Sequence, residues 1–102
     1  EDVSDIRNSK VIDVIKEFES FSCDVEIVDA HADKDEFKHE YGYNLKDGPT
    51  GKYDAVIVAV NHKEYVSLNE DYFINILTDI GEFVDLKGIY RDEFKSVNYW
   101  SL

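Results

Sequence analysis

Tyr53-Asp54-Ala55-Val56-Ile57-Val58-Ala59-Val60 is the stretch that decides the fold. From Ala55 to Val60 it runs through six small or β-branched apolar residues without a polar interruption. A strand with one solvated face alternates polar and apolar residues, whereas a strand of a parallel sheet covered by helices on both sides is apolar throughout. The run is short for a helix and rich in Val and Ile, which favours a strand. We therefore expect a central strand with both faces buried.

Helix and strand patterns alternate on either side of this strand. Asp33 is placed to cap a helix that Gly42 would end, and Asn69 is placed to cap a later helix that Gly81 would end. The expected order is a helix over 9–21, a strand over 23–29, a helix over 34–41, a loop over 44–51, the central strand, a helix over 69–79, a strand over 82–86, a turn over 90–95 and a last strand over 97–102.

This alternation predicts right-handed crossovers and an α/β fold, here a three-layer Rossmann-like parallel sheet. Such a domain normally opens with a strand, whereas this chain opens with a polar segment and a helix. The absent first strand would lie between the strand over 23–29 and the central strand. We therefore expect a fragment whose sheet lacks its first strand. The sheet would either pair those two strands directly or leave a gap that a second chain fills.

Composition narrows the class of protein. A chain of 102 residues that is 43% hydrophobic can bury one core, which predicts a single domain. The net charge of −12 disfavours nucleic acid and anionic membranes as partners, because phosphates would be repelled. No apolar run approaches the length of a membrane span. Cys23 is the one cysteine, so no internal disulfide is possible, and this suits the cytoplasm.

Ligands of parallel α/β sheets bind at the carboxyl ends of the strands. The polar groups expected there are Asp29 to Asp33, Asn61 to Lys63 and Asp85 to Arg91, together with the loop before the first helix. Arg7 and Lys87 are then the natural cations for a phosphate group. The alternative is that both side chains pair with some of the 23 acidic residues.

Residue chemistry alone predicts no catalytic centre and no metal site. His62 is a candidate general base or ligand, but a loop or capping role explains it better, because no partner spacing supports a site. His31 and His39 have no spacing that would build a metal site with His62. Cys23 is interpreted as a small buried or edge residue rather than a nucleophile. What remains is a non-catalytic module that binds a nucleotide or a phosphate.

Three stretches together resemble one family. They are Asp5-Ile6-Arg7-Asn8-Ser9, Tyr53 to Tyr65 and Val84 to Tyr90. They are similar to the C-terminal, UDP-binding domain of the UDP-glucose/GDP-mannose dehydrogenases, and within that family to the branch that oxidises UDP-N-acetylhexosamines for capsule or O-antigen polysaccharides. The resemblance covers essentially residues 1–102.

The resemblance implies a homodimeric, three-domain, NAD-dependent UDP-sugar 6-dehydrogenase, of which this chain is the domain that closes over the UDP-sugar. The enzyme would oxidise a C6 hydroxyl to a carboxylate with two NAD per turnover. The family's catalytic cysteine lies in a Gly-rich motif, which does not surround Cys23, so the isolated chain is expected to be inactive. Arg7 matches the arginine that reaches the NAD phosphates. Lys87 matches the basic position near the UDP-sugar; in many members this position begins an Arg pair, whereas here Gly88 follows.

Two other classes of protein stay open on the residues alone. One is a stand-alone phosphate-binding module with no enzyme attached. The other is a receiver-like signalling domain, which needs an Asp at the end of a central strand. Here Asp54 precedes the strand and Asn61 ends it, which disfavours a receiver domain.

Overall fold

The computed structural model, which describes residues 10–60 and 62–101, contains both helices and parallel strands. The chain forms two compact units, one ending at Gly48 and the other beginning at Pro49. Each unit has its own sheet and its own apolar core. The expected α/β fold with parallel pairing is confirmed, but the described strands are divided between two sheets instead of forming one.

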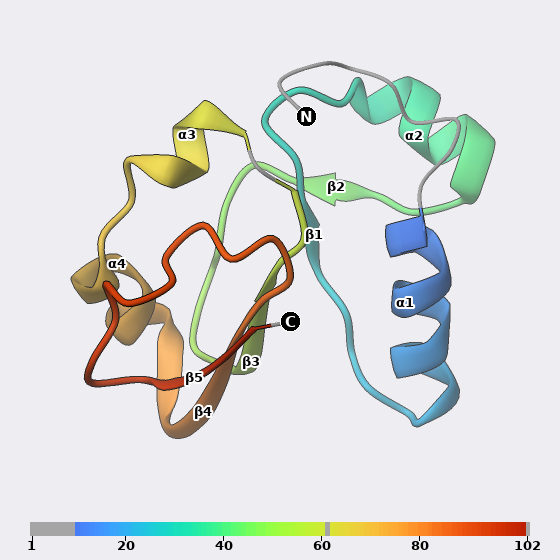
Figure 1. Cartoon of the computed structure of the whole chain (residues 1–102). Coiled ribbons are helices and arrows are strands. Elements are labelled where there is room, and N and C mark those ends of the chain that lie inside the picture. Colours follow the sequence, from blue (N-terminus) through green and yellow to red (C-terminus); the bar gives the residue numbers. More distant parts are fainter. Residues whose placement is uncertain (1–9, 61, 102) are drawn as a thin grey trace. The chain divides into compact units, whose positions relative to one another are not determined.

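The first unit contains four short elements, which Figure 1 labels as α1 (Lys10–Ser20), β1 (Ile27–Val28), α2 (Lys34–Tyr41) and β2 (Leu45–Lys46). β1 pairs with β2 in parallel, so the strand expected over 23–29 is reduced to two residues and the loop over 44–51 contains a strand. The predicted caps of α2 are confirmed. Asp33 Oδ1 accepts a hydrogen bond from the Glu36 N–H at 2.9 Å, and Gly42 ends the helix in the left-handed region.

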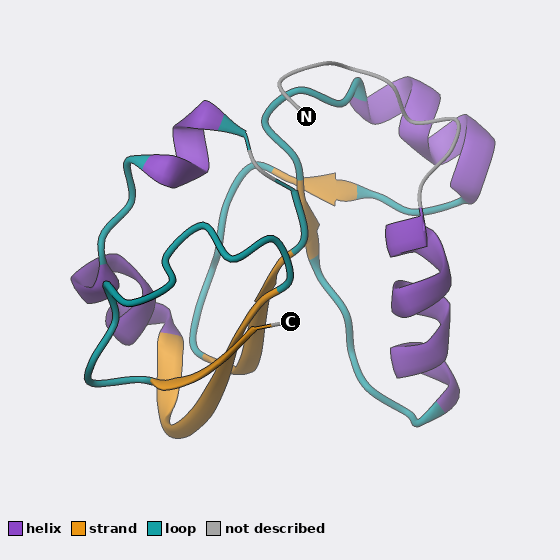
Figure 2. Cartoon of the chain, viewed as in Figure 1, coloured by secondary structure: helices purple, strands orange, loops and turns teal. Residues whose placement is uncertain are grey.

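The second unit contains a three-stranded parallel sheet in the order β3-β4-β5. Its elements are β3 (Tyr53–Val58), α3 (Lys63–Val66), α4 (Glu70–Ile76), β4 (Leu77–Asp85) and β5 (Asn98–Ser101). Its core holds several aromatic rings, among them Phe73 and Phe83, whose centroids lie 4.6 Å apart. Figure 2 shows the long irregular connection, residues 86–97, that leads from β4 to β5.

The boundary between α4 and β4 differs from the prediction. Asn69 caps α4 as expected, since its Oδ1 accepts from the Tyr72 N–H at 3.0 Å. The helix ends at Ile76 instead of continuing to 79, and Gly81 lies inside β4 instead of stopping a helix. Leu77 pairs with Tyr53 of β3, so a contact with a distant strand overrides the local helical pattern. The sequence also did not predict α3.

The central strand is less buried than predicted. Val56 and Val58 pack against the core of the second unit, and Val58 is buried. Ala55 is exposed and Ile57 is half-buried, because these residues alternate onto the opposite face of β3. The expectation of two buried faces is therefore wrong for this structure. β1 and β3 belong to different sheets.

Candidate functional site at the carboxyl edge of the second sheet

Three paired residues mark the carboxyl edge of the sheet in the second unit. Asp85 is the register partner of Val58 on one side and of Ser101 on the other. The Leu86 N–H donates to the Val58 carbonyl at 3.0 Å, which carries the pairing one residue beyond β4. This edge is where a parallel sheet positions a ligand. The first part of the β4–β5 connection, residues 86–91, lies there and is called the β4 turn below.

Asp85 organises the β4 turn. It is fully buried, and its carboxylate accepts three hydrogen bonds. Oδ1 accepts from the Ile89 N–H at 3.0 Å, while Oδ2 accepts from the Tyr90 N–H at 2.8 Å and from the Tyr99 hydroxyl at 2.5 Å. A buried carboxylate needs such donors to replace its lost hydration. The donors on Ile89 and Tyr90 therefore fix the path of the turn relative to the end of β4.

Two tyrosines extend this network and stay protonated at neutral pH. Burial, together with the hydrogen bond to Asp85 and its negative charge, raises the pKa of Tyr99 to about 12. Burial and the charge of Asp85 raise the pKa of Tyr90 well above its ordinary value. The Tyr90 hydroxyl donates to the Tyr65 carbonyl, which links the turn to α3. Both phenols therefore act as fixed donors.

The turn presents two cationic side chains to solvent. Lys87, the predicted phosphate ligand, is exposed on the β4 turn. Arg91 is also exposed, and its Nη2 donates to the Ser101 hydroxyl at 3.1 Å at the end of β5. The sequence placed Arg91 in this region without assigning it a role and did not reveal Asp85 as the centre of the network. An acidic residue that ends an apolar strand just before a Gly-containing turn is the signal that points to it.

The other predicted groups have different positions. Arg7 lies outside the described residues, as does Asn61. His62 occupies the N-cap of α3 and is buried, with its ring 5.4 Å from that of Tyr65. Asp29 belongs to the first unit, where its Oδ1 accepts from the backbone of His31 and Ala32 and so closes a local turn. Lys87 and His62 therefore both follow strands of the second sheet at its carboxyl edge.

Cys23 is exposed in the loop before β1. Of the two predicted settings, buried or edge, the buried one is wrong, and the residue does precede the strand as predicted. Its N–H donates to the Phe18 carbonyl at 3.2 Å, so the residue continues the backbone turn that follows α1.

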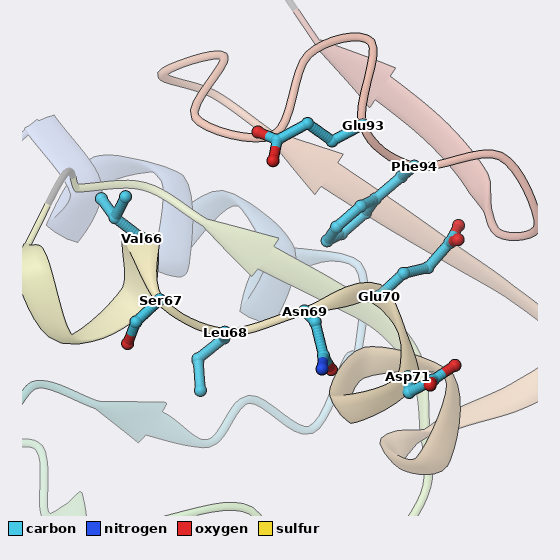
Figure 3. A pocket seen from close by; sticks show the side chains of 8 residues that line it. All are labelled: Val66, Ser67, Leu68, Asn69, Glu70, Asp71, Glu93 and Phe94. Carbon is cyan, nitrogen blue, oxygen red and sulfur yellow. The ribbon is translucent and has the colours of Figure 1, made fainter.

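A depression between α3, α4 and the later part of the connection is acidic. It has a volume of about 490 Å³. Figure 3 shows Phe94 pointing from the connection toward the segment that joins the two helices. Glu70, Asp71 and Glu93 line it, so it would repel a diphosphate.

Backbone hydrogen bonds hold the carboxylate of Glu70 in this depression. Its Oε2 accepts from the N–H groups of Lys95, Ser96 and Val97 at 2.7 to 3.1 Å. Burial alone would raise the pKa of Glu70, but these hydrogen bonds outweigh it and lower the pKa. The carboxylate thus anchors the end of the β4–β5 connection to the start of α4.

Within residues 10–60 and 62–101, no three His, Cys, Asp or Glu side chains are grouped so as to hold a metal ion. No helix in the same ranges is both long and apolar enough to cross a bilayer.

Comparison with known proteins identifies the family. The sequence model described as "UDP-glucose/GDP-mannose dehydrogenase family, UDP binding domain" matches residues 1–92. Protein CapL of Staphylococcus aureus is 38% identical over 96% of this chain. The UDP-N-acetyl-D-glucosamine 6-dehydrogenase of Salmonella typhi is 35% identical over 95% of the chain, and that of Pseudomonas aeruginosa is 32% identical over 94%. The chain spans 23% of the length of each relative. No solved structure is significantly similar. The chain therefore belongs to the UDP-glucose/GDP-mannose dehydrogenase family, in which it corresponds to the UDP-binding domain.

Proposed function

We propose that this chain binds the UDP portion of a UDP-N-acetylhexosamine as the C-terminal domain of an NAD-dependent 6-dehydrogenase that supplies polysaccharide precursors. The family match over residues 1–92 carries the proposal. Two relatives that cover almost the whole chain are named UDP-N-acetyl-D-glucosamine 6-dehydrogenase, which supports the sugar class. Oxidation of the C6 hydroxyl to a carboxylate would take two NAD per turnover, and NAD would accept the hydrides.

Lys87 is the proposed substrate-binding residue. It is exposed on a turn that Asp85 holds at the carboxyl edge of the sheet, where its ammonium group can meet a phosphate. The chain carries a net charge of −12, so a bound diphosphate needs cations placed next to it.

Arg7 is the proposed contact to the NAD phosphates. NAD itself would be held mainly by another domain, since this sequence has no G-x-G-x-x-G turn. We further propose that the chain works beside its own N-terminal and central domains in a cytoplasmic homodimer, and that it is inactive alone. The one cysteine supports a reducing compartment.

A nitrogen-edited NMR titration of the 102-residue chain with UDP tests the binding site. We expect shifts concentrated at residues 85–88 and 62–63. Lys87→Gln should weaken UDP binding roughly five- to tenfold, or about 1 kcal/mol, because the contact it removes is a solvent-exposed charge pair. Lys95→Gln is the matched control, because it removes the same charge from an exposed residue of the same connection. Equal weakening by both variants would show a general charge effect and would contradict a specific role for Lys87.

A hydride-transfer assay tests inactivity. The chain mixed with NAD and UDP-N-acetylglucosamine should form no NADH, because it lacks the family's cysteine motif. Measurable NADH formation by the purified chain would contradict this part of the proposal.

A further inference from the structure

The β4 turn brings the guanidinium group of Arg91 against the backbone of Gly88. A Cβ atom built on residue 88 would lie 2.7 Å from Arg91 Nη2 and 3.1 Å from Arg91 Cζ. Carbon atoms that are not bonded to these groups do not approach so closely. The guanidinium therefore occupies the space that any side chain at position 88 would fill.

The backbone and the end of β5 hold this arrangement in place. Gly88 has φ of +68°, a conformation that glycine adopts without strain. Its N–H donates to the Asp85 carbonyl at 3.3 Å, and its own carbonyl accepts from the Arg91 N–H at 3.4 Å. On the other side, Nη2 of Arg91 donates to the hydroxyl of Ser101, the register partner of Asp85. The guanidinium thus lies across the carboxyl ends of β4 and β5.

The carboxylate of Asp85 does not depend on Arg91 for its hydrogen bonds. The carboxylate of Asp85 already accepts from two backbone N–H groups and from the Tyr99 hydroxyl. Arg91 is exposed and follows Gly88 by three residues. Lys87, the residue before Gly88, carries the other positive charge of the turn. Among the described residues, Arg91 is the only arginine.

We propose that Arg91, seated over Gly88, is a second phosphate-contacting residue and binds the diphosphate of the UDP-sugar together with Lys87. This inference rests on the function proposed above. A planar guanidinium suits the two oxygens of one phosphate, while a lysine ammonium acts as a compact charge on the other. Gly88, which has no side chain, leaves the space beside the turn that the guanidinium fills.

Calorimetric titration of the 102-residue chain with UDP, UMP and uridine tests the proposal. Arg91→Gln should weaken UDP binding about tenfold, weaken UMP binding less, and leave uridine binding unchanged. Lys95→Gln again controls for the loss of one positive charge from the same connection. A loss that is equal for UDP and uridine would indicate a structural role for Arg91 and would overturn the proposal.

Gly88→Asn tests how the arginine is positioned. Asparagine tolerates a positive φ better than other side chains, so the change mainly fills the space under the guanidinium. It should weaken UDP binding about as much as Arg91→Gln. In the Arg91→Gln background it should cost less than a further twofold, because the side chain it displaces is already gone. Full additivity of the two losses would overturn the role given to Gly88.

Failure of the inference and failure of the proposed function give different results. If the wild-type chain binds UDP, and Lys87→Gln weakens binding while Arg91→Gln does not, the inference on Arg91 is wrong and the proposed function stands. If the wild-type chain binds neither UDP nor UMP at millimolar concentrations, both are wrong for this chain. Thermal melts of each variant show whether a lost affinity comes from an unfolded protein.

Discussion

Replacement of Asp85 by Asn tests whether the buried carboxylate organises the carboxyl edge. The substitution keeps the size of the side chain and removes its charge. An amide has one acceptor oxygen, so it can accept either from Ile89 or from the pair formed by Tyr90 and Tyr99, but not from all three donors. The amide NH₂ group would then face a donor that has lost its partner. The structure therefore predicts a local conflict in a fully buried position.

The size of the effect follows from these contacts. A hydrogen bond to a charged group contributes about 1.5 to 3 kcal/mol, and a neutral one about 0.5 to 1.5 kcal/mol. Asp85→Asn loses at least one charged hydrogen bond and makes the remaining ones neutral, while the lower cost of burying an uncharged group offsets part of the loss. We expect the free energy of unfolding to fall by about 2 to 4 kcal/mol. For a domain of this size, the midpoint of thermal unfolding should fall by roughly 10 to 25 °C.

Urea unfolding followed by circular dichroism measures this change. Asp92→Asn is the matched control, since Asp92 is exposed and has φ of +67°, which asparagine adopts readily. The control should stay within about 0.5 kcal/mol of wild type. If Asp85→Asn also unfolds within about 0.5 kcal/mol of wild type at an unchanged m-value, the carboxylate does not hold the turn and the reasoning is wrong.

Three further predictions concern single side chains. Glu70→Gln should lower the free energy of unfolding at neutral pH by about 1 kcal/mol after allowance for partial exposure. Because the folded-state pKa of Glu70 is lowered, wild type should lose this advantage as the pH falls below about 4.5. A stability difference that persists in acid would contradict the assignment. Gly81→Ala places a Cβ 2.9 Å from Leu77 Cδ2 and should cost about 1 to 3 kcal/mol in a urea titration. Gly51→Ala meets no atom within 4 Å and should be neutral or slightly stabilising, so equal costs for the two glycines would refute the packing argument. Tyr99→Phe should remove the part of the alkaline ultraviolet titration centred near pH 12. The stability that wild type gains from the raised pKa of Tyr99 should be complete below pH 10, the ordinary pKa of tyrosine, and should disappear as the pH rises toward 12. An unchanged titration curve would show that another tyrosine ionises there.

Local chemistry explains which elements the sequence could predict. The caps of α2 depend on Asp33 and Gly42, each within a few residues of the groups they serve, and both predictions are confirmed. The end of α4 was predicted wrongly because Leu77 to Ile80 is compatible with either a helix or a strand, and Gly81 looks like a helix stop. Pairing of Leu77 with Tyr53 decides between them, and such long-range pairing leaves no signature in the local pattern.

The candidate site, too, could be predicted only in part from the sequence. The position of Lys87 at the carboxyl edge could be predicted from the sequence, because it follows an apolar strand of a parallel sheet, while its role as a phosphate ligand stays a prediction. The sequence also placed Arg91 in this region, but its contacts with Gly88 and Ser101 could not be predicted, since they exist only once the turn is folded. A glycine in a turn indicates backbone freedom, and only the folded chain reveals what fills the space beside it.

The distribution of charge on the second unit favours this edge of the sheet as the proposed anion site. The described part of the second unit has an acidic depression at α4, where Glu70 is committed to backbone donors, and a turn at the end of β4 where Lys87 and Arg91 are exposed. An anion approaching a chain of net charge −12 gains only where cations are close and nearby carboxylates are already hydrogen-bonded. Asp85, which ends β4, meets that second condition through its three donors, whereas Asp92 and Glu93, which follow Arg91, are exposed acidic residues. Under the proposed function, the network that fixes the turn also engages the Asp85 carboxylate with its own donors, so this carboxylate does not compete with a phosphate for the exposed cations.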